Sequence, residues 1–180
     1  MFEKITPEQA GISSKNVTKF IKMLEKRGAT THGFLFMRGD KIFAEGYWKP
    51  FHQDYLHRQY SQTKSFIGIA IGLLEEEGKL NLDDKIVDYF PEKIEGECDK
   101  YIQEQTIREM LTMKTVGSPS AWFVSGNPDR TNHYFNNKRA THPSGCFWRY
   151  DSAGTQVLCA LVEKLTGKPF LEYLKEKLFN

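Results

Sequence analysis

Residues 61–78 read SQTKSFIGIAIGLLEEEG, with a short polar start, a long apolar middle and an acidic end closed by a glycine. Apolar side chains cover most of the circumference of a helix with this sequence, and such a helix is normally buried. Gly78 is a typical residue to follow a helix end. The stretch therefore predicts a central, buried helix that begins at Ser61.

The residues before this helix predict a first helix and then a hairpin. Ser13 or Ser14 can cap a helix that Gly28 ends, with an apolar face of Val17, Phe20, Ile21 and Leu24. Residues 33–37 and 41–48 read as two strands on either side of a tight turn with a Gly-Asp pair. Two strands alone are marginal in water, so this hairpin needs more strands or helices against it.

The residues after the central helix predict helices only. Residues 81–90 read as a short helix stopped by Pro91, and Thr106 to Glu109 match a capping box that starts another helix ending near Thr112. Residues 113–147 show no sustained period, and a loop this long in a compact domain is usually functional.

The carboxy-terminal residues are periodic again. One helix carries Val157, Leu158, Leu161, Val162 and Leu165 on a single face and stops at Gly167. Pro169 opens a last helix that runs to Leu178. All visible strands therefore lie near the amino end, and we expect their partner strands to lie beyond Asn180.

Composition sets the class of protein. A chain of 180 residues forms one domain or one large piece of one. With 39% hydrophobic and 13% aromatic residues it should fold. A net charge of +2 without a long basic run argues against nucleic-acid binding. The longest apolar run, residues 66–74, is too short to span a membrane.

The sequence also predicts a location. Its start has no apolar core with a small-residue cleavage site, so we expect neither a signal peptide nor a lipid anchor. Cys98, Cys146 and Cys159 are odd in number and widely spaced, as in a protein with free thiols. We therefore expect a cytoplasmic protein.

Ser61 and Lys64 form the first candidate site. Residues three apart on a helix share a face, so the hydroxyl and the amine can meet as a nucleophile and its base. The helix start also offers backbone N–H groups to an oxyanion. As a bare string the motif is weak, and the alternative is that Ser61 is only an N-cap and Lys64 a solvated residue.

Tyr150 forms the second candidate. It lies in the segment Trp148 to Gly154, directly before a well-formed helix, where a phenol can be aimed at a site. Taken alone, it is more simply a half-buried aromatic residue with its hydroxyl in water.

Together these residues resemble the serine β-lactamase and penicillin-binding-protein superfamily, particularly its class C, carboxypeptidase and esterase branch. That branch pairs Ser-x-x-Lys with Tyr-x-Asn and a later Lys/His-x-Gly motif. Three more stretches are similar to it: residues 78–91, 107–113 and 150–170. The resemblance runs from about Pro7 to Asn180 in five ordered blocks.

The resemblance implies an α+β, β-lactamase/transpeptidase-like fold, in which a helix-flanked antiparallel sheet packs with an all-helical lobe. Residues 1–180 would be the amino-terminal portion of one such domain, without its carboxy-terminal strands. Residues 1–60 would hold the first helix and the hairpin, residues 61–150 most of the helical lobe, and residues 151–180 helices that lead back toward the sheet.

The resemblance also implies roles and a reaction. Ser61 would be the acylated nucleophile, Lys64 its proton acceptor and Tyr150 a general base or relay, in acyl transfer from an ester or amide to water. Ser152 stands where β-lactamases have an asparagine that binds substrate. A serine hydroxyl cannot reproduce an amide's donor and acceptor pair, which favours an ester or small amide over a β-lactam.

Other expectations follow from what the sequence lacks. No Lys/His-x-Gly motif follows Tyr150 at the family's distance, so the alternative is a non-catalytic binding domain or an inactive fragment. The five histidines lack metal-ligand spacing and no C-x-x-C occurs, so we expect no metal and no cofactor. The partner would be a small-molecule ester or amide, and an incomplete sheet edge predicts self-association.

Overall fold

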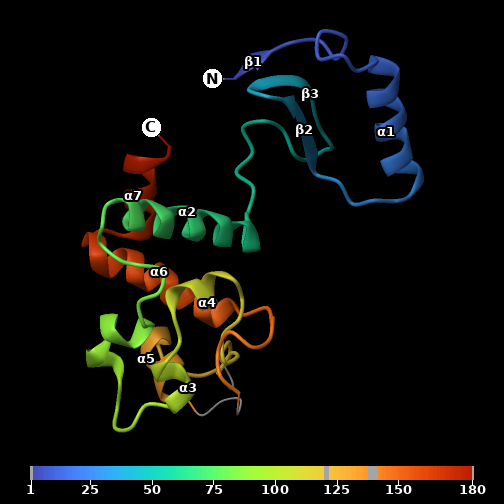
Figure 1. The fold of residues 1–180 in the computed structure, drawn as a ribbon. Coiled ribbons are helices and arrows are strands. Elements are labelled where there is room, and N and C mark those ends of the chain that lie inside the picture. Colours follow the sequence, from blue (N-terminus) through green and yellow to red (C-terminus); the bar gives the residue numbers. More distant parts are fainter. Residues whose placement is uncertain (1, 120–121, 138–141, 180) are drawn as a thin grey trace. The chain divides into compact units, whose positions relative to one another are not determined.

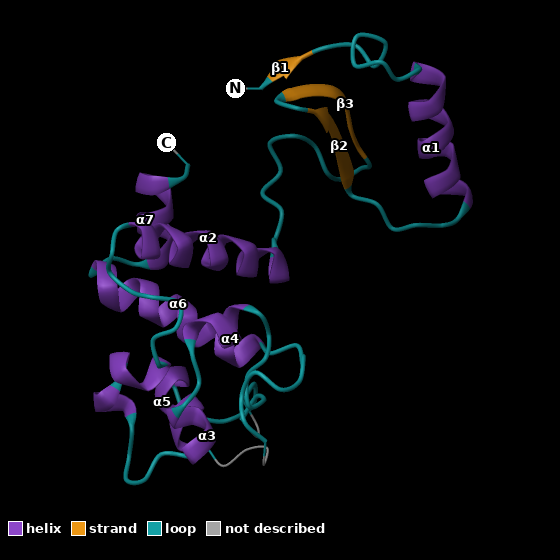
Figure 2. Cartoon of the chain, viewed as in Figure 1, coloured by secondary structure: helices purple, strands orange, loops and turns teal. Residues whose placement is uncertain are grey.

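The structure is a computed structural model that describes residues 2–119, 122–137 and 142–179. The chain divides into two compact units, Met1–Arg58 and Gln59–Asn180. In the described ranges, the strands β1 to β3 and helix α1 belong to the first unit, and the elements of the second unit are helices (Figures 1 and 2). Among the described residues, no helix combines the length and the apolar character that crossing a membrane requires.

The first unit combines helix α1 (Ser14–Lys26) with a three-stranded sheet. Strands β2 (Gly33–Arg38) and β3 (Lys41–Tyr47) form the predicted antiparallel hairpin. Strand β1 (Glu3–Lys4) pairs parallel with β3, which gives the order β1-β3-β2. This third strand was not predicted, because two polar residues carry no strand pattern.

Local chemistry explains these elements. The Ser13 side chain caps α1 by accepting a hydrogen bond from the amide of Lys15. Gly39 adopts a φ of 60° in the two-residue turn, a backbone conformation that glycine reaches without steric cost. The ring of Phe20 on α1 meets the ring of Phe36 on β2 edge to face, with centroids 5.3 Å apart. The helix therefore packs against the hairpin through aromatic side chains.

The second unit is a helical lobe built around two long helices, α2 (Thr63–Glu76) and α6 (Ser152–Thr166), which contact each other. Helix α5 packs on α6 from the other side. The remaining elements are short: η1 (Tyr60–Gln62), η2 (Ile86–Tyr89), η3 (Pro91–Lys93), α3 (Lys100–Gln103), α4 (Ile107–Leu111), α5 (Arg130–Asn136) and α7 (Phe170–Lys177).

A single hydrophobic core fills this lobe, and both long helices contribute to it. Helix α2 buries Ile67, Ala70, Ile71 and Leu74, while helix α6 buries Ala153, Val157, Leu158, Leu161 and Val162. Fully burying one such side chain contributes about 1.5–3 kcal/mol. The core thus fixes α2 and α6 relative to each other. The candidate site residues lie where these two helices begin.

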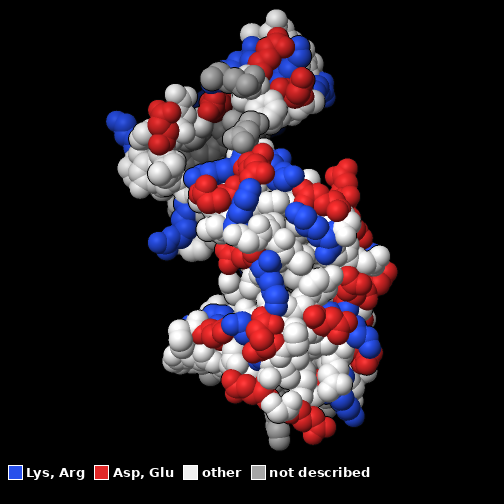
Figure 3. All heavy atoms as spheres, turned by 90° about the vertical axis from the view of Figure 1, so that its left-hand side faces the viewer, with Lys and Arg blue, Asp and Glu red and all other residues white. Residues whose placement is uncertain are grey.

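Charged side chains of both signs are present on the face of the protein that Figure 3 draws. Figure 3 shows acidic and basic groups interspersed over the face in view. Glu77, just past α2, pairs with both Lys79 and Lys177 at 2.8 and 2.7 Å. Hydrogen bonds from these two lysines, Lys177 first, lower the pKa of the Glu77 carboxyl to about 2. The pair with Lys177 ties α7 to the end of α2.

Two predictions about elements were wrong. Residues 81–90 do not form one helix: Asn81 and Asp84 make a hydrogen-bonded turn, and only the 3₁₀ helix η2 follows. The region 113–147, expected to be irregular, contains helix α5. The predicted capping box of α4 is present, with Thr106 and Glu109 each bonded to the other's backbone amide.

Candidate active site

Ser61 and Lys64 lie together where α2 begins. Ser61 is the middle residue of the 3₁₀ turn η1, and Lys64 is the second residue of α2. The Lys64 amine donates a hydrogen bond to Ser61 Oγ over 3.1 Å. The N-cap of α2 is Gln62, whose side chain makes no capping bond, so Ser61 does not serve as this helix's cap.

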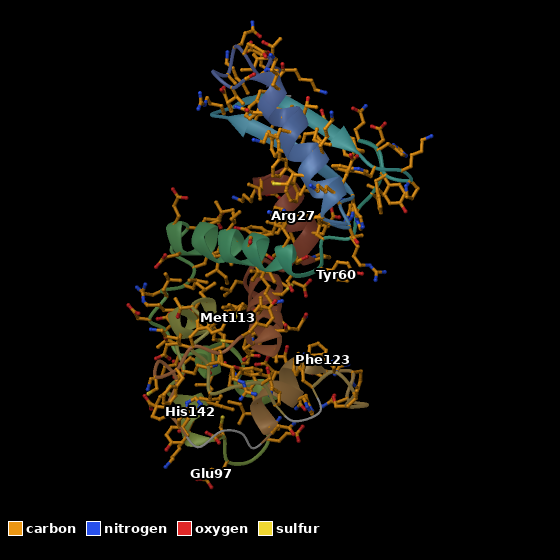
Figure 4. The ribbon with its side chains drawn as sticks, turned by 90° about the vertical axis from the view of Figure 1, so that its right-hand side faces the viewer. Arg27, Tyr60, Glu97, Met113, Phe123 and His142 are labelled. Carbon is orange, nitrogen blue, oxygen red and sulfur yellow. The ribbon has the colours of Figure 1, made fainter. Side chains whose placement is uncertain are left out.

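The residue directly before Ser61 has an unusual backbone conformation. Tyr60 precedes Ser61 with a φ of 47°, in the left-handed region that non-glycine residues seldom adopt. Figure 4 labels this residue at the start of α2. Strained backbone of this kind costs about 1–3 kcal/mol and is concentrated at functional sites.

Tyr150 reaches the same oxygen from a distant part of the sequence. Its phenol donates a hydrogen bond to Ser61 Oγ over 2.7 Å. The Lys64 amine also lies 4.9 Å from the centre of the Tyr150 ring. The structure thus gathers an alcohol, an amine and a phenol around the Ser61 oxygen.

These contacts change the acidity of the phenol. Hydrogen bonding with Lys64, then with Ser61, lowers the pKa of Tyr150 below its ordinary value of 10. The positive charge of Lys64 acts in the same direction, while partial burial opposes it. A phenol with a lowered pKa is a better candidate for a base at moderate pH, because more of it is ionised there.

The loop that carries Tyr150 is held on both sides of it. The Arg149 amide donates to the Met113 carbonyl over 2.8 Å, and the Asp151 amide donates to Met113 Sδ over 3.3 Å. Asp151 is the N-cap of α6, because its carboxylate accepts from the amides of Ala153 and Gly154. Asp151 was not predicted as a site residue, although an aspartate directly before a helix is a capping signal.

A cavity of about 340 Å³ opens in the helical lobe and is lined by Tyr60 and Lys64, which flank Ser61 in the sequence. Two buried apolar side chains, Ile67 and Trp122, contribute to its wall. Phe123, labelled in Figure 4, is 75% exposed and also lines it. Ser152, the predicted substrate contact, lines this cavity too. The other lining residues are Thr63, Thr155 and Gln156.

The described residues hold no group of three or more His, Cys, Asp or Glu side chains that could bind a metal ion.

The hairpin of the first unit and the helical lobe with its Ser-x-x-Lys and tyrosine cluster together define the β-lactamase/transpeptidase class of fold. The chain belongs to the beta-lactamase family, because the family model of that description matches residues 17–180.

Two curated relatives extend this finding. The chain is 27% identical over 164 residues to the 6-aminohexanoate-dimer hydrolase of Paenarthrobacter ureafaciens, covering 83% of this chain and 42% of that protein. It is 27% identical over 146 residues to a penicillin-binding protein of Bacillus subtilis strain 168, covering 73% of this chain and 30% of that protein. The chain thus spans less than half the length of these relatives.

Solved structures share the fold. A structure described as a putative 6-aminohexanoate-dimer hydrolase from Bacillus anthracis matches with a TM-score of 0.73 at 18% identity. The match covers 89% of this chain and 46% of that one. The predicted family and α+β fold class are therefore confirmed.

Proposed function

We propose that this chain carries the nucleophile half of a serine hydrolase site that cleaves an ester or an amide through an acyl-enzyme. The observation that carries the proposal is the hydrogen bonding of both Lys64 and Tyr150 to Ser61 Oγ. Family membership supports it, and the relative from Paenarthrobacter is itself named a hydrolase.

The proposed reaction has two balanced halves. Ser61 Oγ bonds to the carbonyl carbon of the substrate while its proton passes to the ionised phenol of Tyr150, whose oxygen lies 2.7 Å from Oγ and which the Lys64 cation stabilises. The proton then passes to the departing alcohol or amine as its bond to carbon breaks. Water then attacks the acyl carbon of the Ser61 ester and gives a proton to the Tyr150 oxygen. The bond between the acyl carbon and Ser61 Oγ breaks, the carboxylic acid leaves, and Oγ takes the proton back from Tyr150.

The cavity beside Ser61 guides the choice of substrate. Its wall carries buried apolar side chains, and Lys64, already engaged with Ser61, is the one charged residue among those that line it. We therefore propose an uncharged acyl group. The hydroxyl of Ser152 offers one short polar contact, which suits an ester or a small amide better than a β-lactam.

Further parts of the site come from the resemblance alone. We expect a Lys/His-x-Gly strand with a second oxyanion donor outside residues 1–180. The alternative proposal is a binding domain without turnover, which the lack of that motif in this stretch favours.

The three free cysteines, Cys98, Cys146 and Cys159, suit a cytoplasmic location. Within the described part of the chain, β2 lies at the edge of the sheet, and such an edge suits self-association, which sedimentation at rising concentration measures.

An activity-based probe tests the nucleophile. We expect a fluorophosphonate to label the wild-type protein covalently and to leave Ser61→Ala unlabelled. Ser65→Ala is the matched control, because Ser65 is an exposed serine on the same helix and one residue beyond Lys64. Equal labelling of Ser61→Ala and the wild type would refute the assignment. A folded wild type that binds esters but takes no label would instead support the binding domain.

A further inference from the structure

The residue after Tyr150 is a buried carboxylate with an unusual number of partners. Asp151 is only 1% exposed. Its Oδ1 accepts hydrogen bonds from the amides of Ala153 and Gly154, at 2.9 and 3.1 Å, and from the Ser118 hydroxyl at 2.5 Å. Its Oδ2 accepts from the Thr115 hydroxyl over 2.7 Å. Four neutral donors therefore surround a carboxylate that lies inside the protein.

A helix cap alone does not require this arrangement. An N-cap needs one side-chain oxygen on the first amides of the helix, and serine, threonine or an exposed aspartate provides it. Burying a carboxylate is unfavourable unless its oxygens are fully hydrogen-bonded. The bonds to Thr115 and Ser118 do not cap α6, but they join its start to the loop that follows α4.

That loop is itself fixed to the core. The Val116 amide donates to Gln105 Oε1 over 3.1 Å, and Gln105 Nε2 donates to the Tyr134 hydroxyl over 2.8 Å. Gln105 and Tyr134 are both fully buried. Residues 115–118 are thus a support bonded to the core through Val116, and the Asp151 carboxylate bonds to this support at Thr115 and Ser118.

From these contacts we infer that Asp151, together with Thr115 and Ser118, is the positioning device that holds the Tyr150 phenol at Ser61. Arg149 is bonded to Met113 on one side of Tyr150, and Asp151 is bonded to residues 115–118 on the other. The phenol between them is 50% exposed. Its 2.7 Å approach to Ser61 then depends on these two anchors.

Two sets of variants separate positioning from helix capping. The first support variant, Thr115→Val with Ser118→Ala, removes the two hydroxyls that donate to the Asp151 carboxylate. It leaves the bonds from the Ala153 and Gly154 amides to Asp151 in place. The second support variant, Asp151→Ser, keeps a residue that can cap α6, but the serine side chain is too short to reach Thr115 and Ser118. Asp99→Ser is the control, because Asp99 caps α3 by accepting from the Tyr101 amide over 2.8 Å.

The measurement follows the phenol directly. In protein labelled with ¹³C at tyrosine Cζ, the Tyr150 signal is assigned by its loss in Tyr150→Phe and is titrated with pH. The wild-type midpoint should lie below the ordinary value near 10, since Lys64 lowers the pKa of Tyr150. We expect both support variants to raise that midpoint toward 10 and the control to leave it unchanged.

A second readout relates this inference to the proposed function, on which its catalytic meaning rests. Fluorophosphonate labelling of Ser61 should slow by on the order of tenfold to a hundredfold in both support variants, because a displacement near 1 Å has effects of that size. Folded support variants with the wild-type titration midpoint would overturn the inference. If the double variant does not fold, the single Thr115→Val variant decides by the same titration. A wild type that titrates as expected but takes no label refutes the hydrolase and leaves the positioning role intact.

Discussion

At Tyr150, the proton affinity of one oxygen depends on an amine from a distant part of the chain. Lys64 lowers the pKa of the phenol by hydrogen bonding and by its charge. The folded protein therefore releases this proton at a lower pH than the unfolded chain does. Between the two pKa values the unfolded state binds more protons, so this group makes the folded state more stable as pH rises through that window.

Removing the cation should reverse this effect. We expect Lys64→Gln to raise the Tyr150 pKa toward 10, measured by ¹³C titration of the phenol. Lys64→Arg is the matched control, because an arginine stays charged and keeps the pKa low, but it cannot accept a proton from Ser61. An unchanged midpoint in Lys64→Gln would mean that Lys64 does not set the acidity of Tyr150.

The same two variants separate two roles of the amine. If Lys64 acts only through its charge, Lys64→Arg keeps fluorophosphonate labelling at Ser61. If Lys64 is the proton acceptor, both Lys64→Gln and Lys64→Arg lose fluorophosphonate labelling at Ser61.

Sequence could predict these residues only in part. The spacing of Ser61 and Lys64 places both heads on one face of a helix start, and the structure has them 3.1 Å apart. Nothing in the spacing places Tyr150 there, and only the resemblance to a family suggested it. Asp151 shows a capping signal, but its bonds to Thr115 and Ser118 cross more than thirty residues and leave no trace in a local pattern.

Among the elements, the end of α4 organises the loop that leads to Tyr150. Met113 follows this helix with a φ of 58°, a position that glycine usually takes, and the Lys114 amide bonds back to the Glu109 carbonyl. Ser144 donates to the Glu109 carboxylate over 2.7 Å, and the Gly145 amide donates to the Lys114 carbonyl over 2.7 Å. The Tyr150 loop is therefore anchored at its start as well as beside the phenol.

A side chain at Gly145 should disturb this anchor. Gly145 has a φ of 82°, and a Cβ there would lie 2.7 Å from Glu109 Oε1, on a carboxylate already bonded to Ser144 and the Thr106 amide. We expect Gly145→Ala to reduce the free energy of unfolding by about 2–4 kcal/mol, from backbone strain and displaced hydrogen bonds together. Urea unfolding measures it.

Gly96→Ala is the matched control for that change. Gly96 has a φ of 70° and nothing within 4 Å of the added Cβ, so only the backbone conformation opposes alanine. We expect a loss of about 1 kcal/mol. Equal losses in the two variants would show that Glu109 gives way freely and that the anchor at Ser144 contributes little.

The elements that sequence predicted are those whose local signals agree. Helices α1, α6 and α7 have periodic apolar faces and clear caps or stops, and the hairpin has a glycine turn. Helix α5 spans only seven residues of modest helix propensity. It is held by the Asp129 cap, by the ion pair from Asp129 to Lys93, and by burial of Tyr134 and Phe135. Such a helix depends on tertiary contacts that no sequence window contains.

Across the whole molecule, the two units differ in what holds them together. Among the described residues, the buried hydrophobic side chains of the first unit are Ala10 and Ile42, and all the others belong to the core of the second unit. A short sheet with a single helix buries too little apolar surface to offset the loss of chain entropy. The helical lobe carries the catalytic candidates and also the larger part of the folding free energy.

Separate expression of the two units tests this difference. We expect residues 59–180 alone to unfold cooperatively in urea, with a slope of about 1–3 kcal/mol per molar. We expect residues 1–58 alone to show only a gradual change, because few apolar groups leave water when they order. Circular dichroism follows both transitions. In residues 59–180, Leu158→Ala removes a fully buried side chain and should lower the urea midpoint, with a loss of about 2–5 kcal/mol in the free energy of unfolding. A cooperative transition for residues 1–58 would show instead that the aromatic contacts between α1 and the hairpin suffice for independent folding.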